Sequence, residues 1–447
     1  MNNILKTGLL YLVVANLAVS FAFAENPDIM TLDECLEYAL ANNRDIKISE
    51  LQVRQSEHTI QEAKSVGLPQ VNAYATFDDN LKLPTQMLPG EFLGEPGTTV
   101  PVQFGTQFSS TAGVQVDQLL YNQSYFVGLK ASKASEQLSF LEKEKTEEDV
   151  IYTVTANYYK TLQYQEELKI IDNNLELFDR LLKIMKVRVE NDLIREVDYN
   201  RVKVNKINLE TQRKALEVVL NNQKDMLKFY MGLPVGQEIN LDNHSVTAFK
   251  ESDVLNVLNM QPEERIELKI LKQQLELNQL NEKYIASGYY PTLKAYGRYT
   301  FQGQRNSFNE LYREQWFDAS VIGVRLDIPI FDGFKKKHQI IKSELDQSVI
   351  QENTVKTKEI MNVEQQTAMS RLSNGLDALE AQQENVELAG KVLKQVNSLY
   401  SEGVSQLTDL LDAETAFREA QIEYNRVVIN IKIAELDLAK SNGKLKN

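Results

Sequence analysis

The sequence predicts a mainly helical protein with a smaller strand-forming portion, in which one large structural unit occurs twice. Long stretches without helix breakers alternate with short segments in which apolar residues occupy every second position. Three landmarks recur in the same order at nearly equal distances, which indicates an internal duplication. The repeat is far longer than the about 20–50 residues of a solenoid repeat. The landmark pairs are Pro69 and Pro291, Gly113 and Gly323, and Asp198 and Asp409, which lie 222, 210 and 211 positions apart.

Each half contains two predicted strands with a loop between them. In the first half, alternating patterns occur at residues 71–77, after Pro69, and at residues 108–116. Residues 78–105 are rich in Pro and Gly and predict a loop too long for an ordinary connection in a compact domain. The second half repeats the arrangement, with strands near residues 292–302 and 316–328 and a shorter loop at residues 303–315.

Long helices account for most of the remaining sequence. The segment from about Ser124 to Glu190 has no Pro, so it predicts a helix of about 100 Å at 1.5 Å per residue. Its partner runs to about Tyr230, after a break at Asn191 and Asp192. Further helices are expected over about residues 31–66, 263–287, 334–401 and 408–440. The last helix has a coiled-coil seam, and its counterpart in the first half has the same register. The seam positions are Phe417, Ala420, Tyr424, Val427, Ile431, Ala434 and Leu438, and Leu209, Leu216, Leu220 and Leu227.

These elements divide the chain into four segments. Residues 1–24 have a positive charge, an apolar core and a terminal Ala-Phe-Ala, the pattern of a secretory signal peptide; an uncleaved anchor helix is the alternative. Residues 25–232 form the first repeat, residues 233–262 an equatorial connector, and residues 263–447 the second repeat. No lipobox precedes Cys35, so lipidation at that residue is not expected.

The composition argues against several classes of function. A net charge of −14 disfavours binding to nucleic acid or to an anionic membrane surface. A single cysteine excludes an intramolecular disulfide and a multi-cysteine metal site. The three histidines are scattered, and no HExxH motif or glycine-rich phosphate loop occurs. We therefore expect a protein that is not an enzyme and has no cofactor or metal site.

The predicted elements cannot complete a stable structure in one chain. Four strands are too few to close a membrane barrel, whose minimum is about eight strands, and open strand edges are not viable in lipid. A helical pair about 100 Å long also lacks a globular core of its own. The strands could lie outside a membrane, and the helices could pack against another protein, but both problems favour an oligomer that shares one barrel and one helical tunnel. Aromatic residues near the strands fit interfacial girdles, although β-propensity alone explains the same enrichment.

Two motifs carry a family resemblance. Residues 328–333 read Ile-Pro-Ile-Phe-Asp-Gly at the strand-to-helix junction, and residues 400–413 form the tip of the second helical hairpin. Together with the duplicated element order, they resemble the TolC-like outer-membrane efflux proteins of Gram-negative bacteria over the whole mature chain. The resemblance implies a homotrimer, with a twelve-stranded β-barrel in outer-membrane lipid and a periplasmic α-barrel. It also implies a porin-like, passive duct for efflux or type I secretion, joined by a periplasmic adaptor (membrane fusion) protein to an inner-membrane pump.

The resemblance places an entrance constriction at the second tip. Asp409 and Asp412 lie three positions apart and therefore share a helix face. In a trimer they would form two acidic rings, and rings of carboxylates attract cations. The alternative is that both carboxylates interact favourably with the dipole at the start of the last helix.

The resemblance also implies a latch that holds the entrance closed. Tyr400 and Asp198 would form a hydrogen bond between the two hairpins. Ser405 stands where well-known family members have a latch arginine, so a latch of that form is not expected. Arg195, three residues before Asp198, is a candidate replacement; a solvated surface arginine is the alternative.

Small and apolar positions at the tips are candidates for contact with an adaptor. Two other functions remain as alternatives: a periplasmic coiled-coil adaptor and a structural protein of the cell envelope. The duplicated strand pairs argue against the first, and the aromatic-rich strands argue against the second. The sequence does not identify the transported substrate. The candidate adaptor-contacting residues are Leu193, Ile194, Gly403, Val404 and Leu407.

Overall fold

The computed structural model describes residues 29–90, 94, 96–242 and 265–446. This part of the chain divides into two compact units, and each takes residues from both sequence repeats. We call them the helical unit (residues up to 48, 144–265 and 358–447) and the sheet unit (residues 49–143 and 266–357). The predicted signal peptide lies outside the described residues, as does the connector after residue 242.

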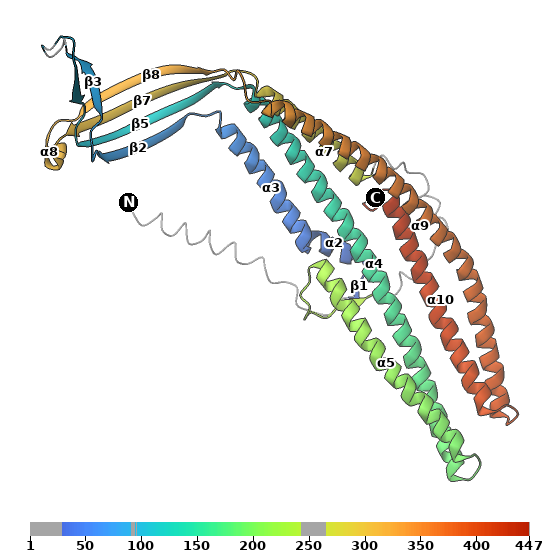
Figure 1. Ribbon diagram of the computed structural model, residues 1–447. Helices are drawn as coiled ribbons and strands as arrows, with labels where there is room; N and C mark the ends of the chain where they lie inside the picture. The colour runs from blue at the N-terminus through green and yellow to red at the C-terminus, as the bar shows by residue number, and fades with distance from the viewer. Residues whose placement is uncertain (1–28, 91–93, 95, 243–264, 447) are drawn as a thin grey trace, which may run out of the picture. The chain divides into compact units, whose positions relative to one another are not determined.

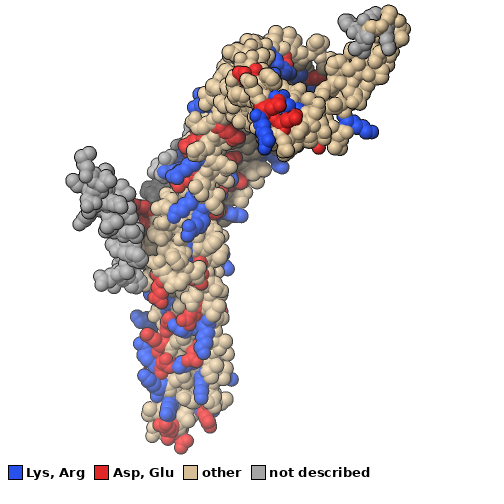
Figure 2. Space-filling model, turned by 90° about the vertical axis from the view of Figure 1, so that its left-hand side faces the viewer, with Lys and Arg blue, Asp and Glu red and all other residues tan. Residues whose placement is uncertain are grey.

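The helical unit consists mainly of two long hairpins, α4–α5 and α9–α10 (Figure 1). The long helices predicted from the sequence are confirmed within a few residues. Lys, Arg, Asp and Glu are interspersed along the helical surface (Figure 2). In the described residues, no helix has the length and apolar character required to cross a membrane. The helices with residues in this unit are α2 (Leu32–Asn42), α3 (Arg44–Ser65), α4 (Gln123–Glu190), α5 (Glu196–Met231), α9 (Lys335–Ser401) and α10 (Leu407–Ser441).

The helix predicted over residues 31–66 is broken at Asn43, so that prediction was wrong in one respect. The capping box that begins α2 is present, with Glu34 accepting from the Thr31 backbone N–H. At the break, the Asn43 side chain accepts from the backbone N–H of Ile46 and donates to the Tyr230 carbonyl at 2.6 Å. The first bond caps α3, and the second ties the break to the end of α5.

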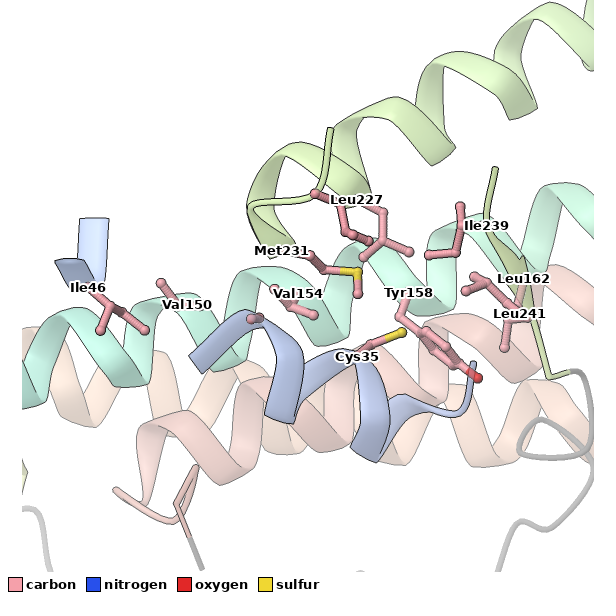
Figure 3. Packing of buried hydrophobic residues seen from close by; sticks show 12 residues of the cluster. Cys35, Ile46, Val150, Val154, Tyr158, Leu162, Leu227, Met231, Ile239 and Leu241 are labelled. Atoms are coloured by element: carbon pink, nitrogen blue, oxygen red, sulfur yellow. The ribbon is translucent and has the colours of Figure 1, made fainter. Parts of the chain in front are cut away.

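A buried apolar cluster lies where α2, α4 and α5 meet (Figure 3). Tyr158 of α4 is fully buried there and donates its hydroxyl to the Asp242 carbonyl at 3.0 Å. The short strands β1 (Ile29–Met30) and β6 (Asn240–Leu241) pair in parallel beside it. Other members of the cluster are Cys35, Ala39, Ile46, Val150, Val154, Leu162, Leu227, Met231, Leu233, Ile239 and Leu241.

The predicted seam of α10 packs closely against α9. A Cβ added at Gly375 of α9 would lie 2.8 Å from the Ile431 side chain, and one at Gly390 would lie 3.1 Å from Phe417. These two glycines therefore accept large side chains of α10, as a hole accepts a knob in a coiled coil. Most seam positions are buried: Ala420, Val427, Ile431, Ala434 and Leu438 in α10, and Leu209, Leu216, Leu220 and Leu227 in α5.

The sheet unit is built around four antiparallel strands in the order β2-β5-β7-β8. β5 is the second strand of the first repeat and β7 is the first strand of the second repeat, so the centre of the sheet joins the two repeats. In the described residues, β2 and β8 each pair along one side only, and they form the two edges (Figure 1). The strands are β2 (Gln70–Asp79), β5 (Phe108–Tyr121), β7 (Thr292–Arg305) and β8 (Phe317–Asp327), and helix α7 (Ile266–Ser287) precedes β7.

Both predicted loops contain regular structure. Residues 78–105 hold an antiparallel hairpin of β3 (Thr85–Pro89) and β4 (Thr99–Gln103), of which β4 has an alternating pattern. The loop at residues 303–315 holds the short helix α8 (Phe308–Arg313). The Phe308 ring packs edge-on against two strand residues, with its centroid 5.8 Å from those of both Phe77 and Phe108. An aromatic cluster therefore covers this end of the sheet.

Candidate functional site at the hairpin tips

The two hairpin tips turn in the same way despite their different sequences. Gly403 ends α9 with a left-handed backbone (φ 77°), and Asp192 adopts the same region after α4 (φ 54°). Asp is among the few residues other than Gly that tolerate this conformation. In both tips the next residue donates its backbone N–H to a carbonyl of the helix, from Val404 to Leu399 and from Leu193 to Arg188. The Gly-to-Asp difference between the repeats therefore leaves the turn intact.

An apolar cluster joins the second tip to the first hairpin. Leu407 and Leu411 of α10 belong to the same cluster as residues of α4 and α5, and Tyr400 is partly buried against it. Leu407 is only 6% exposed, because its side chain fills this cluster. The expectation that Leu407 is an exposed adaptor-contacting position was therefore wrong. The cluster members from the first hairpin are Ile171, Phe178, Met185, Val202, Leu209 and Leu216.

The other tip candidates differ in exposure. Leu193 and Val404 are each 72% exposed, and Gly403 is also exposed. Ile194 is partly buried against the apolar cluster. The tip thus presents two isolated apolar side chains, one from each hairpin.

Asp409 forms part of the cap of α10. Its Oδ2 accepts from the backbone N–H of the N-cap residue Gln406 at 3.0 Å and from the Ser405 hydroxyl at 2.9 Å. The Gln406 side chain completes a capping box with the Asp409 backbone N–H. Ser405, at the position of the family's latch arginine, is therefore a partner of Asp409 in this cap.

The two tip aspartates lie on the exposed side of α10. Asp409 and Asp412 are exposed, whereas Leu410 and Leu411 between them are 2% and 8% exposed. This division confirms the shared helix face predicted from their spacing. Asp409 also has direct hydrogen bonds at the helix start, a contact that neither the ring nor the helix-dipole interpretation predicted.

Asp198 is held by its neighbour in the first tip. The Arg195 guanidinium donates from Nε to Asp198 Oδ2 at 3.0 Å and from a second nitrogen to Oδ1 at 3.3 Å. Asp198 has 18% of its side chain exposed, and Arg195 has 80%. Between the described side chains of Tyr400 and Asp198 there is no hydrogen bond, and the carboxylate is paired with Arg195 instead.

Tyr400 nevertheless lies within the electrostatic influence of the first hairpin. Burial raises the pKa of the Tyr400 hydroxyl, the positive charge of Arg188 opposes that rise, and the negative charge of Asp198 adds to it. Residues from both hairpins thus meet around this hydroxyl, although the bond implied by the resemblance is absent.

Sequence reasoning did not single out Glu414, which follows the tip on α10. Its side chain is buried, 8% of the residue is exposed, and its Oε2 has no hydrogen-bond partner in the described structure. Burial raises the pKa of this carboxyl group, and the charge of Arg418 opposes the rise. Continuing the seam back from Phe417 by its alternating steps reaches Ala413, so the sequence pattern gave no signal that the adjacent Glu414 is buried.

The second repeat matches a known family. Residues 263–444 match the model of the family described as outer membrane efflux protein. This segment is an outer membrane efflux protein domain. The match confirms the expected family resemblance for this half of the chain. No curated protein has a significant sequence match to the chain.

Solved outer-membrane channels share the fold over most of both chains. The outer-membrane channel OprN has a TM-score of 0.70 and 15% identity, covering 92% of this chain and 89% of that one. CusC has a TM-score of 0.70 and 14% identity, covering 94% and 95%. The Campylobacter jejuni CmeC outer membrane channel has a TM-score of 0.69 and 16% identity, covering 96% and 90%. Because these similarities cover 92–96% of this chain, they show that the first repeat shares the channel fold as well.

The capping role of Asp409 is testable separately from any role in a channel. Asp409→Ala removes the acceptor of the Gln406 N–H, and losing such a cap costs about 0.5–2 kcal/mol. We expect faster hydrogen exchange at the backbone amides of residues 406–410 in this variant. Asp412→Ala, the matched control, should leave these amides protected. Equal exchange in the two variants would contradict the capping role.

Proposed function

We propose that the protein is the outer-membrane channel-tunnel of a tripartite efflux or type I secretion system. It would be a passive exit duct, and three copies would share one twelve-stranded barrel and one helical tunnel. The observation that carries the proposal is the four-stranded sheet, whose two outer strands each have one neighbouring strand in the described residues, in a chain whose residues 263–444 match the outer membrane efflux protein family. In lipid those edges require partners.

The proposal extends to a periplasmic adaptor and an inner-membrane pump. Leu193 and Val404 support an adaptor contact, because each is exposed at a tip, and Gly403 and Ile194 flank them. The duct itself would carry out no catalysis, so energy for transport would have to come from the pump. The family match is to a transport protein, which favours this function over a structural role.

The assembly is expected to be trimeric in detergent. Mass measurement of the protein extracted from outer membranes should give three times the chain mass, because three four-stranded sheets are needed for the proposed barrel. A slowly migrating band that heating converts to the monomer should accompany it. A stable monomer that forms no conducting pores in planar bilayers would contradict the channel-tunnel proposal.

The exposed tip carboxylates are proposed to make the entrance cation-selective. Three copies would bring Asp409 and Asp412 into two acidic rings, and their mutual repulsion favours bound multivalent cations. In planar bilayers, Asp409→Asn with Asp412→Asn should reduce both cation preference and block by trivalent ions. Asn retains an oxygen acceptor for the α10 cap, so the tip should remain folded.

Glu380→Gln with Glu384→Gln is the matched control for this experiment. It removes the same charge from exposed positions on α9, away from the tip. If the control reduces selectivity as much as the tip variant does, overall charge rather than the proposed rings determines it.

We propose that Tyr400, Asp198 and Arg195 together restrain the entrance. Tyr400 packs against the first hairpin, and Arg195 holds Asp198 beside it. Arg195→Ala and Asp198→Ala should each raise single-channel conductance. The double variant should add little, because the two residues share one ion pair.

The two Tyr400 variants separate ring packing from hydroxyl bonding. Tyr400→Ala should raise conductance because it removes the packed ring, whereas Tyr400→Phe keeps the ring and should resemble wild type. If Arg195→Ala, Asp198→Ala and Tyr400→Ala all show wild-type conductance, the restraint lies elsewhere on the tip.

A further inference from the structure

One face of the four-stranded sheet is apolar and continues past the end of β8. Leu293 pairs with Leu326 on this face. The next pair, Lys294 with Arg325, lies on the opposite face, because successive residues of a strand point to opposite sides. Exposed apolar side chains then recur at every second position of β8 and beyond it, as on a strand that contacts the acyl chains of a lipid layer. We call them the apolar stripe: Ile322, Val324, Leu326, Ile328 and Ile330.

Two phenylalanine rings end the apolar stripe. Phe331 is 75% exposed and Phe334 is 59% exposed, and their rings meet edge-on with centroids 5.4 Å apart. Gly333 and Phe334 both have a left-handed backbone, with φ 66° and 65°. A bulky residue rarely adopts this region, so the turn holds Phe334 in a strained backbone while its ring stays on the surface. Backbone outliers of this kind cluster at functional sites.

Three lysines follow the rings directly and begin α9. Asp332 pairs with the middle one, since its Oδ2 accepts from Lys336 Nζ at 3.0 Å and from the Lys336 backbone N–H at 3.2 Å. Lys336 also lies over the Tyr289 ring, 5.0 Å from its centroid. Lys335 and Lys337 are exposed, and neither forms an ion pair with a described residue. Two ammonium groups are thus left over where the apolar surface ends.

This positive charge is local, and it is unfavourable without a partner. Residues 328–343 contain four lysines and one acidic residue, Asp332, in a chain of net charge −14. The lysines repel one another, and cations in the first turn of a helix also oppose its dipole. The equivalent positions of the first repeat, 210 residues earlier, are Tyr125, Phe126 and Val127. The fold of the junction therefore does not require lysines, and an anionic partner would offset both costs.

We infer that Lys335 and Lys337 bind the phosphate of an anionic phospholipid whose acyl chains lie against the apolar stripe. The order along the chain is apolar stripe, aromatic rings and then lysines, which matches acyl chains, interface and headgroups across one leaflet. Basic residues at the end of a membrane segment attract anionic headgroups in this way. The occupant is a lipid rather than free phosphate because the lysines continue an exposed apolar surface. This inference rests on the proposed membrane channel and names a lipid class that it binds.

Counting bound lipids on the intact assembly tests this site. The full chain, purified in detergent and stripped of lipid, is mixed with equal amounts of phosphatidylglycerol and phosphatidylethanolamine and weighed by native mass spectrometry. We expect the wild type to retain roughly fivefold more of the anionic lipid than of the zwitterionic one. The preference should weaken as the salt concentration rises, because exposed charges are screened.

Lys335→Gln with Lys337→Gln is the decisive variant, because Gln removes both charges and remains a good helix former. It should retain the two lipids equally. Lys356→Gln with Lys358→Gln is the matched control, since these exposed lysines have the same spacing and lie 21 positions further along α9. The control should keep the wild-type preference.

The aromatic pair separates the apolar part of the site from the charged part. Phe331→Ala with Phe334→Ala should lower retention of both lipids and leave their ratio unchanged, because the lysines that distinguish the headgroups remain. A changed ratio would contradict this division of roles.

The outcomes separate the lipid site from the proposed function. A conducting wild-type trimer with no preference for phosphatidylglycerol would overturn the site alone. An unchanged preference in Lys335→Gln with Lys337→Gln, or an equal loss in the matched control, would also overturn it. If the variant dissociates into monomers with its preference intact, the lysines pair with a neighbouring copy instead. A wild-type monomer that forms no pores and retains neither lipid would overturn the proposed channel as well.

Discussion

Backbone hydrogen bonding at the edges of the four-stranded sheet is the constraint on which the rest of the structure depends. β5 and β7 are paired on both sides, while β2 and β8 are paired on one. Within the sheet unit these strands continue into α3, α4, α7 and α9. Open edges are costly in lipid, so in the proposed barrel the sheet would require neighbours, which further copies of the same duplicated sequence would supply. In the described residues the chain contributes four strands to this sheet, and the duplication would allow identical copies to extend it in the proposed assembly.

Packing in the helical unit follows a different rule, since no edge has to be paired. Apolar seams and two glycine positions set the spacing of α9 and α10. Polar contacts then tie the repeats together: the Asp437 carboxylate of α10 accepts from the Tyr152 hydroxyl of α4 at 2.7 Å and from Arg371 of α9 at 3.3 Å. Asn425 of α10 donates to the Gln163 carbonyl of α4 at 3.1 Å. Directional bonds of this kind fix how far one helix slides along another, which apolar contact alone leaves loosely defined.

The features that were predicted well from the sequence are those that depend on local periodicity. The long helices and the buried leucines of α5 follow from spacing along one helix, so a single sequence shows them. Asn43 was missed because its main partner, the Tyr230 carbonyl, lies 187 positions away. Leu407 was misjudged for a similar reason, since its burial depends on residues of the other hairpin. The β3–β4 hairpin was missed because its Pro and Gly residues obscured a short alternating pattern.

The Asp198 contact shows a different source of error. An arginine three positions before an aspartate is a local pair that the sequence displays, and the structure joins the two at 3.0 Å. The family resemblance directed attention to Tyr400 instead. A resemblance supplies the position of a site more securely than its hydrogen bonds, because nearby substitutions such as Ser405 redistribute the partners.

The two interpretations of Asp409 are compatible on structural grounds. Both cap bonds end on Oδ2, so Oδ1 takes no part in the cap. The cap holds the carboxylate at a fixed place on the first turn of α10, and buried Leu407, Leu410 and Leu411 fix the turn itself. A carboxylate that is already held in this way loses little side-chain conformational entropy when it becomes part of a ring of charges. The width of any entrance lined by Asp409 is therefore set by the apolar packing beneath it, which links the stability of the tip to its selectivity.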